Sequence, residues 1–485
     1  MLFNSIEFFI FFIIVFFTYW FLLDKKLYLQ NLFILISSYS FYAWWDWRFL
    51  FLILFSTCVD YICAKKIYTH RKSYFKKRYL SFSIIINIGI LLYFKYFNFF
   101  VESWIDLMMK IGFSVENLRN FNIILPVGIS FYTFQTISYS LDVYYGKIKP
   151  SNNFISFASF VSFFPQLVAG PIERANNLMP QILKKRIFKV QNIKTGLNLI
   201  FWGLFKKIVI ADSLGAHVDF IFKNYQVLNG GILFIGMIYF SFQLYCDFSG
   251  YSDIAIGSAK LLGFELISNF KYPFFSTNPV DFWNRWHISL SSWIRDYLYN
   301  PIAIYFIRNF NYPFTKYVPH IITMLIIGLW HGANWTFVFF GLYWGLTVCI
   351  YLMFFKNISN VLAGLFFKVL SIFIMFLISS LSFLIFRSQS VNDFFSYLSI
   401  MINSFEIPKN LLDGFFFILI IIVFDYLHRK DERLPLDFKT MFCSTSIFSN
   451  YCLKTISYFS IISIIFWFIL IFTLKNQNQF LYFQF

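Results

Sequence analysis

An imidazole and a carboxamide stand inside an apolar stretch of the sequence. The stretch reads LIIGLWHGANW from Leu325 to Trp335 and contains His331 and Asn334. Burial disfavours the charged form of an imidazole, so we expect His331 to be neutral and able to accept a proton. A neutral buried histidine can act as a general base, and the group that it would deprotonate is a hydroxyl that attacks an acyl carbon. The alternative is a histidine that only bridges two helices through hydrogen bonds.

The surroundings of His331 favour the catalytic alternative. Gly328 and Gly332 leave room for a close approach. Trp330 and Trp335 flank the imidazole. His331 also follows Lys316 by about fifteen residues, or roughly 22 Å of helix, which places it deep in a membrane and towards its outer half. Ionisable residues at such depth are functional candidates by default.

A second imidazole lies in the segment DFWNRWHISLSSWIRDYLYNP, from Asp281 to Pro301. Its mixture of tryptophans with charged residues predicts a helix that lies at the membrane interface. On such a helix Arg285 and Arg295 would be within reach of His287, and they could hold the phosphate groups of a donor molecule. The alternative is an aromatic belt with snorkelling arginines.

Charged side chains interrupt two further apolar runs. Asp247 and Asp253 in YCDFSGYSDIAIG could line a cavity or form ion pairs with the two arginines, and we favour structural pairing. Lys206 and Lys207 in FWGLFKKIVIAD could join the donor pocket, or they could mark the end of a helix.

Several common catalytic signatures are missing from the sequence. It contains no HExxH motif, no Cys/His cluster with metal-ligand spacing, and no GxSxG, Walker or GxGxxG pattern in a credible setting. The cysteines form no CxxC pair and mostly stand in apolar runs, which is typical of buried small hydrophobic residues. We therefore expect neither a metal site nor a permanently bound cofactor.

The composition points to a membrane protein. Hydrophobic residues make up 59% of the 485 positions and charged residues only 13%, so one soluble core could not hide the apolar surface. A helix that spans a bilayer needs about 20 mainly apolar residues. About twelve such segments are expected, at residues 6–23, 29–45, 49–64, 80–97, 121–141, 195–215, 232–247, 317–331, 334–355, 362–386, 411–427 and 455–474.

The charged loops predict the orientation of these segments. Cytoplasmic loops are rich in Lys and Arg, and residues 65–78 alone include seven of them. If the N-terminus is outside, this loop, the basic residues of 147–194 and the HRKDER segment at His428 are all cytoplasmic, and the C-terminus is outside as well. Orientation explains the net charge of +17 better than nucleic acid does, because the basic residues are distributed by loop.

One apolar segment does not fit a simple bundle of helices. FISFASFVSFFPQLVAGP, residues 154–171, is interrupted by Pro165, Gly170 and Pro171. Non-helical backbone at membrane depth survives only where it is buried in protein or lines a wet cavity. We therefore predict a re-entrant structure for this segment.

Five stretches, in order along the chain, carry a resemblance to a known family. They run from Leu125 to Gly345 and read LPVGISFYTFQTISYSLDVYYG, FFPQLVAGPIER, YCDFSGYSDIAIG, DFWNRWHISLSSWIRDYLY and GLWHGANWTFVFFGLYWG. FNSIEFFIFF and SYSFYAWW near the N-terminus and the final YFQF add to the likeness. Together they resemble the membrane-bound O-acyltransferases, specifically the bacterial branch that includes the membrane subunits of alginate and peptidoglycan O-acetylation.

The resemblance implies an all-α integral membrane fold. About 11–12 transmembrane helices, with re-entrant and interfacial helices, would surround a thin centre between a cytoplasmic and an outer cavity. One polytopic domain would cover residues 1–485, with N-terminal helices in 1–100, core motifs in 125–345 and C-terminal helices in 362–485.

The resemblance also implies the chemistry. His331 matches the family's deep catalytic histidine and His287 its second, cytoplasm-facing one. An acyl group, usually acetyl from acetyl-CoA or another thioester, would pass to a polysaccharide or peptidoglycan outside the bacterial cytoplasmic membrane, often through a serine-esterase-like (SGNH-type) partner. We further expect substrate contacts from Asn334, Trp330, Arg285, Trp286, Arg295 and Asp247. An acyltransferase for a lipid or another small acceptor, or a membrane transporter or flippase, stays open as an alternative.

Overall fold

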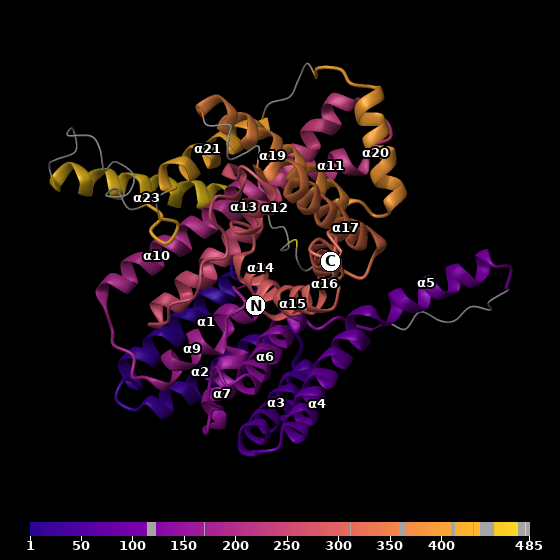
Figure 1. Ribbon diagram of the computed structural model, residues 1–485. Coiled ribbons are helices and arrows are strands. Elements are labelled where there is room, and N and C mark those ends of the chain that lie inside the picture. The colour runs from indigo at the N-terminus through magenta and orange to yellow at the C-terminus, as the bar shows by residue number, and fades with distance from the viewer. Residues whose placement is uncertain are drawn as a thin grey trace. The chain divides into compact units, whose positions relative to one another are not determined.

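The computed structural model shows a chain built of helices (Figure 1). It describes residues 1–113, 123–168, 170–310, 312–357, 364–408, 413–429, 431–436, 451–473 and 481, and no strand occurs among them. These residues group into two compact units, Met1–Lys189 with Leu261–Leu266, and Val190–Lys260 with Ile267–Phe485. One domain over the whole chain therefore stays a prediction, and the final YFQF lies outside the described residues.

Several described helices have the length and composition of membrane spans. The long apolar stretches are Leu27–Thr69, Ser73–Lys110, Gly230–Leu261, Trp335–Phe355 and Leu365–Arg387. Shorter apolar helices are Ile6–Leu22, Phe154–Leu167, Val318–His331, Gly414–His428 and Phe459–Thr473. Each of the twelve predicted segments overlaps helical backbone in the structure, although parts of 121–141, 362–386, 411–427 and 455–474 lie outside the described residues. The all-α integral membrane fold is confirmed.

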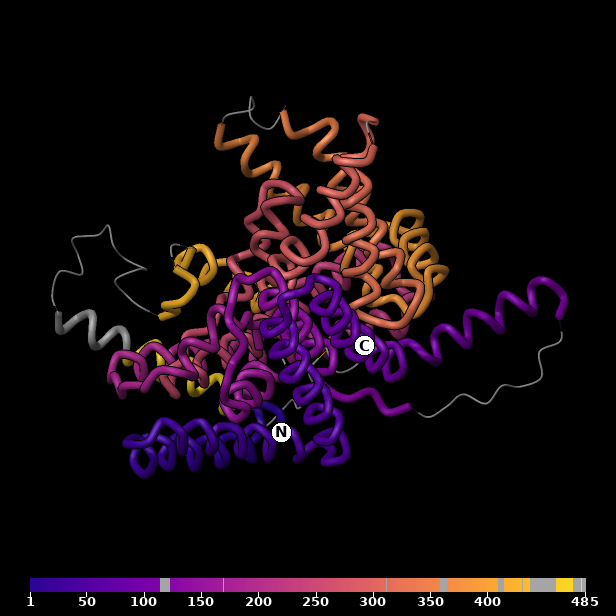
Figure 2. Tube along the Cα trace, turned by 60° about the horizontal axis from the view of Figure 1, so that its bottom comes forward, coloured from indigo at the N-terminus to yellow at the C-terminus, as the bar shows by residue number. Residues whose placement is uncertain are grey.

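The first unit consists of helices from the N-terminal part of the chain. They are α1 (Ile6–Phe17), η1 (Thr18–Leu22), α2 (Leu27–Asp46), η2 (Trp47–Phe49), α3 (Leu50–Thr69), α4 (Ser73–Leu91), η3 (Leu92–Tyr96), α5 (Phe97–Lys110), α6 (Ile129–Tyr144), α7 (Phe154–Ser162), α8 (Phe164–Leu167) and α9 (Ala175–Leu183). Within this unit α3 and α4 lie side by side, and α5 extends away from them (Figures 1 and 2).

The re-entrant prediction for residues 154–171 falls on two short helices of the first unit. The helix break lies at Phe163, whose ψ of 106° is not helical, and Pro165 follows in the first turn of α8, where a proline is tolerated because that N–H has no helical partner. Phe157, Phe160 and Phe163 are completely buried. The interrupted backbone is therefore buried in protein, as the apolar sequence requires.

The second unit carries both candidate histidines. Its helices are α10 (Val190–Leu204), η4 (Phe205–Ala211), α11 (Asp212–Lys223), α12 (Gly230–Leu261), η5 (Pro273–Phe275), α13 (Pro279–Trp283), α14 (Ile288–Ile294), η6 (Arg295–Tyr299), α15 (Asn300–Asn309), α16 (Val318–His331), α17 (Trp335–Ile350), η7 (Tyr351–Phe355), α19 (Leu365–Arg387), α20 (Val391–Asn403), α21 (Asp413–His428) and α23 (Tyr451–Thr473).

Glycines allow α10 and α12 to cross closely in the second unit. A Cβ atom on Gly203 would lie 2.5 Å from the carbonyl oxygen of Gly250, and one on Gly257 would lie 2.6 Å from that of Gly196. Small residues at such crossings let two backbones approach, as is common between membrane helices. The helix α12 continues to Leu261, well beyond the predicted end at residue 247.

A single interfacial helix over residues 281–301 is wrong. The structure interrupts the segment once, after α13 ends at Trp283. A left-handed residue, His287, lies in this break, and α14, η6 and α15 then form continuous helical backbone. Trp283, Trp286 and Trp293 are buried in the protein. The composition could not distinguish the two cases, because tryptophans are typical both of an interfacial helix and of an aromatic core.

Candidate active site

His331 lies where three helix ends meet in the second unit. It is the last residue of α16, four positions before α17 begins, and its imidazole centroid lies 5.3 Å from the ring of Phe386 near the end of α19. The 14 residues of α16 span about 21 Å of helix, and the depth of His331 in the membrane stays a prediction. His331 is 6% exposed, whereas His287 is 0% exposed, so His331 is the more accessible imidazole.

The glycines beside His331 bring α16 and α17 into contact. A Cβ atom on Gly328 would collide with the carbonyl oxygen of Phe337 and lie 3.0 Å from the amide nitrogen of Gly341. One on Gly332 would collide with the ring of Phe337. The close approach predicted at these glycines is confirmed, and the packing fixes the direction in which the end of α16 presents His331.

Asn334 begins the next helix. Its side-chain oxygen accepts a hydrogen bond from the backbone N–H of Thr336 at 2.9 Å, the usual N-cap contact, and its Nδ2 donates to the carbonyl of Gln389 at 3.2 Å. These bonds tie the start of α17 to the chain just after α19. A substrate contact for Asn334 stays a prediction.

His287 contacts the same tryptophan as His331. Its centroid is 5.7 Å from the Trp330 ring, and the centroid of His331 is 5.0 Å from that ring, so both imidazoles contact one buried indole. Phe248 of α12 packs edge-on against His287 at 4.8 Å. The structure therefore brings together the two histidines and the tryptophan that the sequence analysis singled out.

The backbone and titration of His287 are both unusual. Its φ of 43° is in the left-handed region, which non-glycine residues rarely occupy and which is enriched at functional sites. His287 lies outside the candidate membrane-spanning helices, and burial lowers its pKa to about 3. Its imidazole is therefore neutral at physiological pH.

Two partners of His287 were missed in the sequence analysis. Its Nδ1 lies 3.0 Å from Oδ1 of Asn269, and the hydroxyl of Ser289 donates to the same oxygen at 2.9 Å. Ser289 could have been suspected, because it follows the imidazole by two residues. Asn269 lies in an irregular segment with no motif spacing to His287, so no sequence signal pointed to it.

The two predicted arginines pair with nearby acids. Arg285 Nε donates to Asp281 at 2.7 Å, and Arg295 Nε donates to Asp296 at 3.0 Å. Arg295 belongs to η6, beyond α14, while Arg285 precedes the His287 turn, so the common helix that would have placed both beside the imidazole does not exist. Phosphate binding by these arginines stays a prediction.

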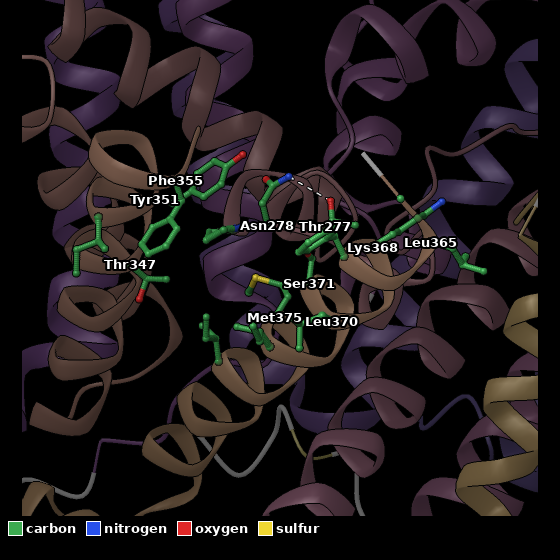
Figure 3. A pocket seen from close by; sticks show the side chains of 16 residues that line it. Thr277, Asn278, Thr347, Tyr351, Phe355, Leu365, Lys368, Leu370, Ser371 and Met375 are labelled. Atoms are coloured by element: carbon green, nitrogen blue, oxygen red, sulfur yellow. Dashed lines mark hydrogen bonds between the residues drawn. The ribbon is translucent and has the colours of Figure 1, made fainter. Parts of the chain in front are cut away.

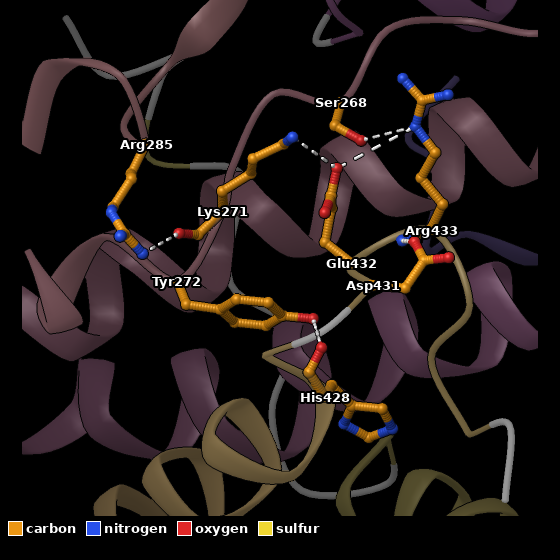
Figure 4. Close-up of polar contacts among 8 residues, drawn as sticks. All are labelled: Ser268, Lys271, Tyr272, Arg285, His428, Asp431, Glu432 and Arg433. Carbon is orange, nitrogen blue, oxygen red and sulfur yellow. Dashed lines mark hydrogen bonds and ion pairs between the residues drawn. The ribbon is translucent and has the colours of Figure 1, made fainter. Parts of the chain in front are cut away.

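A polar network lies along the chain beside Asn269 (Figure 4). It contains Lys271 with Glu432 at 3.4 Å, Arg433 with Ser268 at 3.3 Å, and Tyr272 with the carbonyl of His428 at 2.8 Å. A bond of 3.5 Å from Arg285 to the carbonyl of Lys271 joins the arginine to this network. The network fastens the segment that carries Asn269 to the chain after α21.

Trp286 is part of an aromatic core. Its ring lies 4.9 Å from Phe383, 5.1 Å from Phe270 and 5.7 Å from Phe282. Such contacts stabilise the turn that holds His287. A contact between Trp286 and substrate stays a prediction.

The acidic residues of α12 form structural pairs, as we favoured, but the arginine partners are wrong. Asp253 binds Lys206 at 2.6 Å, and Asp247 binds Lys207 at 2.6 Å. Lys207 also binds Asp212 at 2.8 Å. Both lysines lie in a π-helical turn inside a continuous helix, so they do not mark the end of a helix, and neither lines the cavity of about 210 Å³ beside α16. Asp247 additionally accepts the backbone N–H of Leu481 at 2.9 Å.

Replacing Lys207 with methionine is expected to destabilise the protein by about 3–5 kcal/mol. The side chains of Lys207, Asp212 and Asp247 are 1%, 3% and 2% exposed, so removing the cation leaves two buried carboxylates without their counter-charge. Thermal unfolding in detergent measures the loss.

The matched control for that prediction is Lys271→Met. Lys271 is 51% exposed and forms an ion pair of 3.4 Å with Glu432, and exposed pairs contribute only about 0–1 kcal/mol. Equal unfolding midpoints for the two variants would contradict a stabilising role for the buried triad.

A cavity of about 210 Å³ approaches the two histidines. It is lined by Ile288, the residue after His287, and by Ile327, one helical turn before His331. Arg295 also lines it, and a bond of 3.0 Å joins Tyr299 to His320 in its wall. The cavity therefore runs along the first part of α16, from His320 to Ile327, and does not include either candidate histidine in its lining.

A larger groove of about 970 Å³ runs along α17, η7 and α19 (Figure 3). Its walls are mostly apolar, with Lys368, Thr277 and Asn278 as polar members. Neither histidine lines this groove or the smaller cavity, but only the smaller cavity is lined by neighbours of both, Ile288 and Ile327, and Phe355 and Leu365 of the groove are strongly exposed. We assign the candidate chemistry to the smaller cavity.

Comparison with known proteins identifies the family of the chain. Residues 151–388, which include both histidines, match the model of the membrane-bound O-acyltransferase family. The chain is 39% identical over 351 residues to the probable alginate O-acetylase AlgI of Pseudomonas aeruginosa, a match that covers 72% of this chain and just under two thirds, 66%, of that protein.

Two other relatives act on different polymers by their names. The chain is 35% identical over 380 residues to the peptidoglycan O-acetyltransferase of Helicobacter pylori, which covers 72% of this chain and 70% of that protein. It is 32% identical over 299 residues to the teichoic acid D-alanyltransferase of Streptococcus thermophilus, which covers 57% and 70%.

Proposed function

The chain belongs to the membrane-bound O-acyltransferase family, and on this basis we propose that it is an enzyme that transfers an acyl group from a thioester to a hydroxyl. The observation that carries the proposal is the pair of buried imidazoles that both contact the ring of Trp330. A structural scaffold needs no such pair, because burying imidazoles that do no chemistry has a cost in apolar surroundings.

His331 is the general base of the proposed reaction. Its imidazole takes the proton of the acceptor hydroxyl while the hydroxyl oxygen attacks the thioester carbonyl carbon. The tetrahedral intermediate then collapses, the carbon–sulfur bond breaks, and the imidazolium of His331 returns the proton to the leaving thiolate. An ester and a thiol are formed, and no redox partner or metal enters the balance.

The donor is proposed to reach the histidines through the 210 Å³ cavity. The cavity extends from Arg295 and the Tyr299–His320 pair towards Ile288 and Ile327. Arg295 at this cavity offers a guanidinium to a phosphate-bearing donor such as acetyl-CoA. By the charge pattern of the loops, the N-terminal end of α16 is cytoplasmic and both termini of the protein are outside. A matching passage from the outer face to His331 is part of the proposal.

The acceptor is proposed to be a polymer outside the bacterial cytoplasmic membrane. The related proteins are named for alginate, peptidoglycan and teichoic acid, so what their names share is acyl transfer to an envelope polymer. Acetyl is the proposed acyl group, since two of these names specify acetylation. The proposed partner is a serine-esterase-like protein outside the membrane, which delivers the acyl group to the polymer.

Inverted membrane vesicles that contain the protein test this function. Labelled acetyl-CoA is added to the cytoplasmic face, which is exposed in such vesicles, and the polymer is enclosed in the lumen with the proposed partner. We expect label to appear in the lumen as an ester that mild base releases. Vesicles without the protein give the background.

The other outcomes separate the alternatives. Intact labelled acetyl-CoA in the lumen, without ester, would show a transporter. Label that extracts with lipid would keep the acyltransferase but replace the polymer by a lipid acceptor. The absence of any transfer from acetyl-CoA, with transfer from another thioester, would overturn acetyl-CoA as the donor.

A further inference from the structure

Asn269 holds the turn that presents His287. Its backbone carbonyl accepts the N–H of Ile288 at 2.9 Å, and its side-chain Oδ1 accepts the N–H of Ser289 at 3.3 Å and the Ser289 hydroxyl at 2.9 Å. The Nδ1 atom of His287 lies 3.0 Å from the same Oδ1. The backbone and side chain of this one residue therefore contact the three consecutive residues of the turn.

The contact with Ser289 establishes which atom of the Asn269 amide faces His287. A backbone N–H can only donate a hydrogen bond, so the amide atom that receives it is the oxygen. An amide oxygen can only accept. The nitrogen of His287 that meets this oxygen must then carry the imidazole proton, because two acceptors cannot form a hydrogen bond with each other.

We propose that Asn269 is a positioning residue that fixes His287 in the tautomer with its proton on Nδ1 and its lone pair on Nε2. This inference rests on the proposed function, in which His287 serves the donor side of the reaction. It assigns to His287 the role of a hydrogen-bond or proton acceptor, such as for an amide N–H of a pantetheine-type thioester. Partners that orient a histidine in this way commonly set its tautomer and basicity.

His287 also contacts aromatic and polar groups of the neighbouring elements. These are Phe248 from α12 and Trp330 from α16, together with the hydroxyl of Ser289 at 3.4 Å. Among the charged groups near this turn, Asp247 and Asp253 pair with lysines, and Arg285 pairs with Asp281. His331 is a titratable group that contacts the same indole, Trp330.

The tautomer can be observed without measuring activity. Nitrogen-15 labelling of the histidine imidazoles of the full chain in nanodiscs separates protonated from unprotonated ring nitrogens by NMR, and His287→Asn identifies the signals of His287. We expect the proton on Nδ1 in the natural protein. In Asn269→Ala we expect the proton to exchange between both nitrogens or to move to Nε2. A natural protein with the proton on Nε2 would overturn the proposal.

Variants of Asn269 connect the tautomer with the reaction. Asn269→Ala is expected to lower the transfer rate by about 10–100-fold at every pH, in the range that outer partners of histidines produce. Asn269→Asp keeps an acceptor at the same place but adds a carboxylate, which raises the pKa of His287. The transfer rate of Asn269→Asp should therefore be highest near pH 9, where His287 is neutral, and should fall as the pH is lowered to about 6 and His287 takes up a proton.

The control is Asn198→Ala, which removes another buried amide from the same unit and should leave the shape of the pH profile unchanged. A similar profile for Asn269→Asp and Asn269→Ala would show that Asn269 acts only on stability and would overturn the positioning role. If Asn269→Ala does not fold, the NMR spectrum of the natural protein and the pH profile of Asn269→Asp still test whether Asn269 positions His287. A failure of the proposed function gives a different result from a failure of the positioning role, because neither histidine would then be needed for acyl transfer.

Discussion

Acyl transfer is expected to disappear when His331 is replaced with alanine, while the protein stays folded in the membrane. A general base typically contributes about 10²–10⁴-fold in rate, or roughly 3–5 kcal/mol of barrier. His331 ends α16, where its imidazole packs against the rings of Trp330, Phe340 and Phe386, while the close packing of α16 on α17 depends on Gly328 and Gly341, which the substitution keeps. The vesicle assay with labelled acetyl-CoA measures the rate, and fluorescence-detected chromatography measures folding.

The matched control is His217→Ala. His217 is a half-buried histidine of α11, with its ring 5.9 Å from Tyr239, and it has no place in the proposed chemistry. Its transfer rate should equal that of the natural protein. A stable His331→Ala protein that still transfers acetyl at the natural rate would refute the assignment of the base.

The helices of this protein could be predicted well because apolar length is a local property. Segments such as 317–331 and 334–355 agree with α16 and with α17 plus η7 within one residue. The end of α12 was missed because Asp247 and Ser249 look like interruptions until their lysine partners are known. The helix α20 was also missed, although Ser390 and Asp393 form a capping pair that the sequence offered as a signal.

The site was predictable only in part, for reasons of distance along the chain. Ionisable residues in apolar surroundings are conspicuous, which is why His331 and His287 could be identified from the sequence. Their relative placement depends on Trp330, and the ion pairs depend on residues about forty positions apart, such as Lys207 and Asp247. Asn269 illustrates the limit, because a single hydrogen bond across an irregular segment leaves no periodic trace.

Replacing His287 with asparagine is expected to lower the transfer rate by about 10²-fold without unfolding the protein, because a misplaced donor costs rate even when the base is intact. Asparagine is the informative substitution. The backbone of His287 is left-handed, with a φ of 43°, and asparagine tolerates that conformation better than alanine does. His287→Asn therefore removes the imidazole and preserves the turn between α13 and α14.

The comparison with His287→Ala separates chemistry from folding. Alanine disfavours the left-handed backbone by about 1–2 kcal/mol, so this variant should show both a lower unfolding temperature and a lower rate. If the rate depends on the imidazole, His287→Asn and His287→Ala lose similar activity although only the alanine protein is destabilised. If instead the activity follows the unfolding temperature, with His287→Asn as active as the natural protein, His287 supports the fold and takes no part in the reaction.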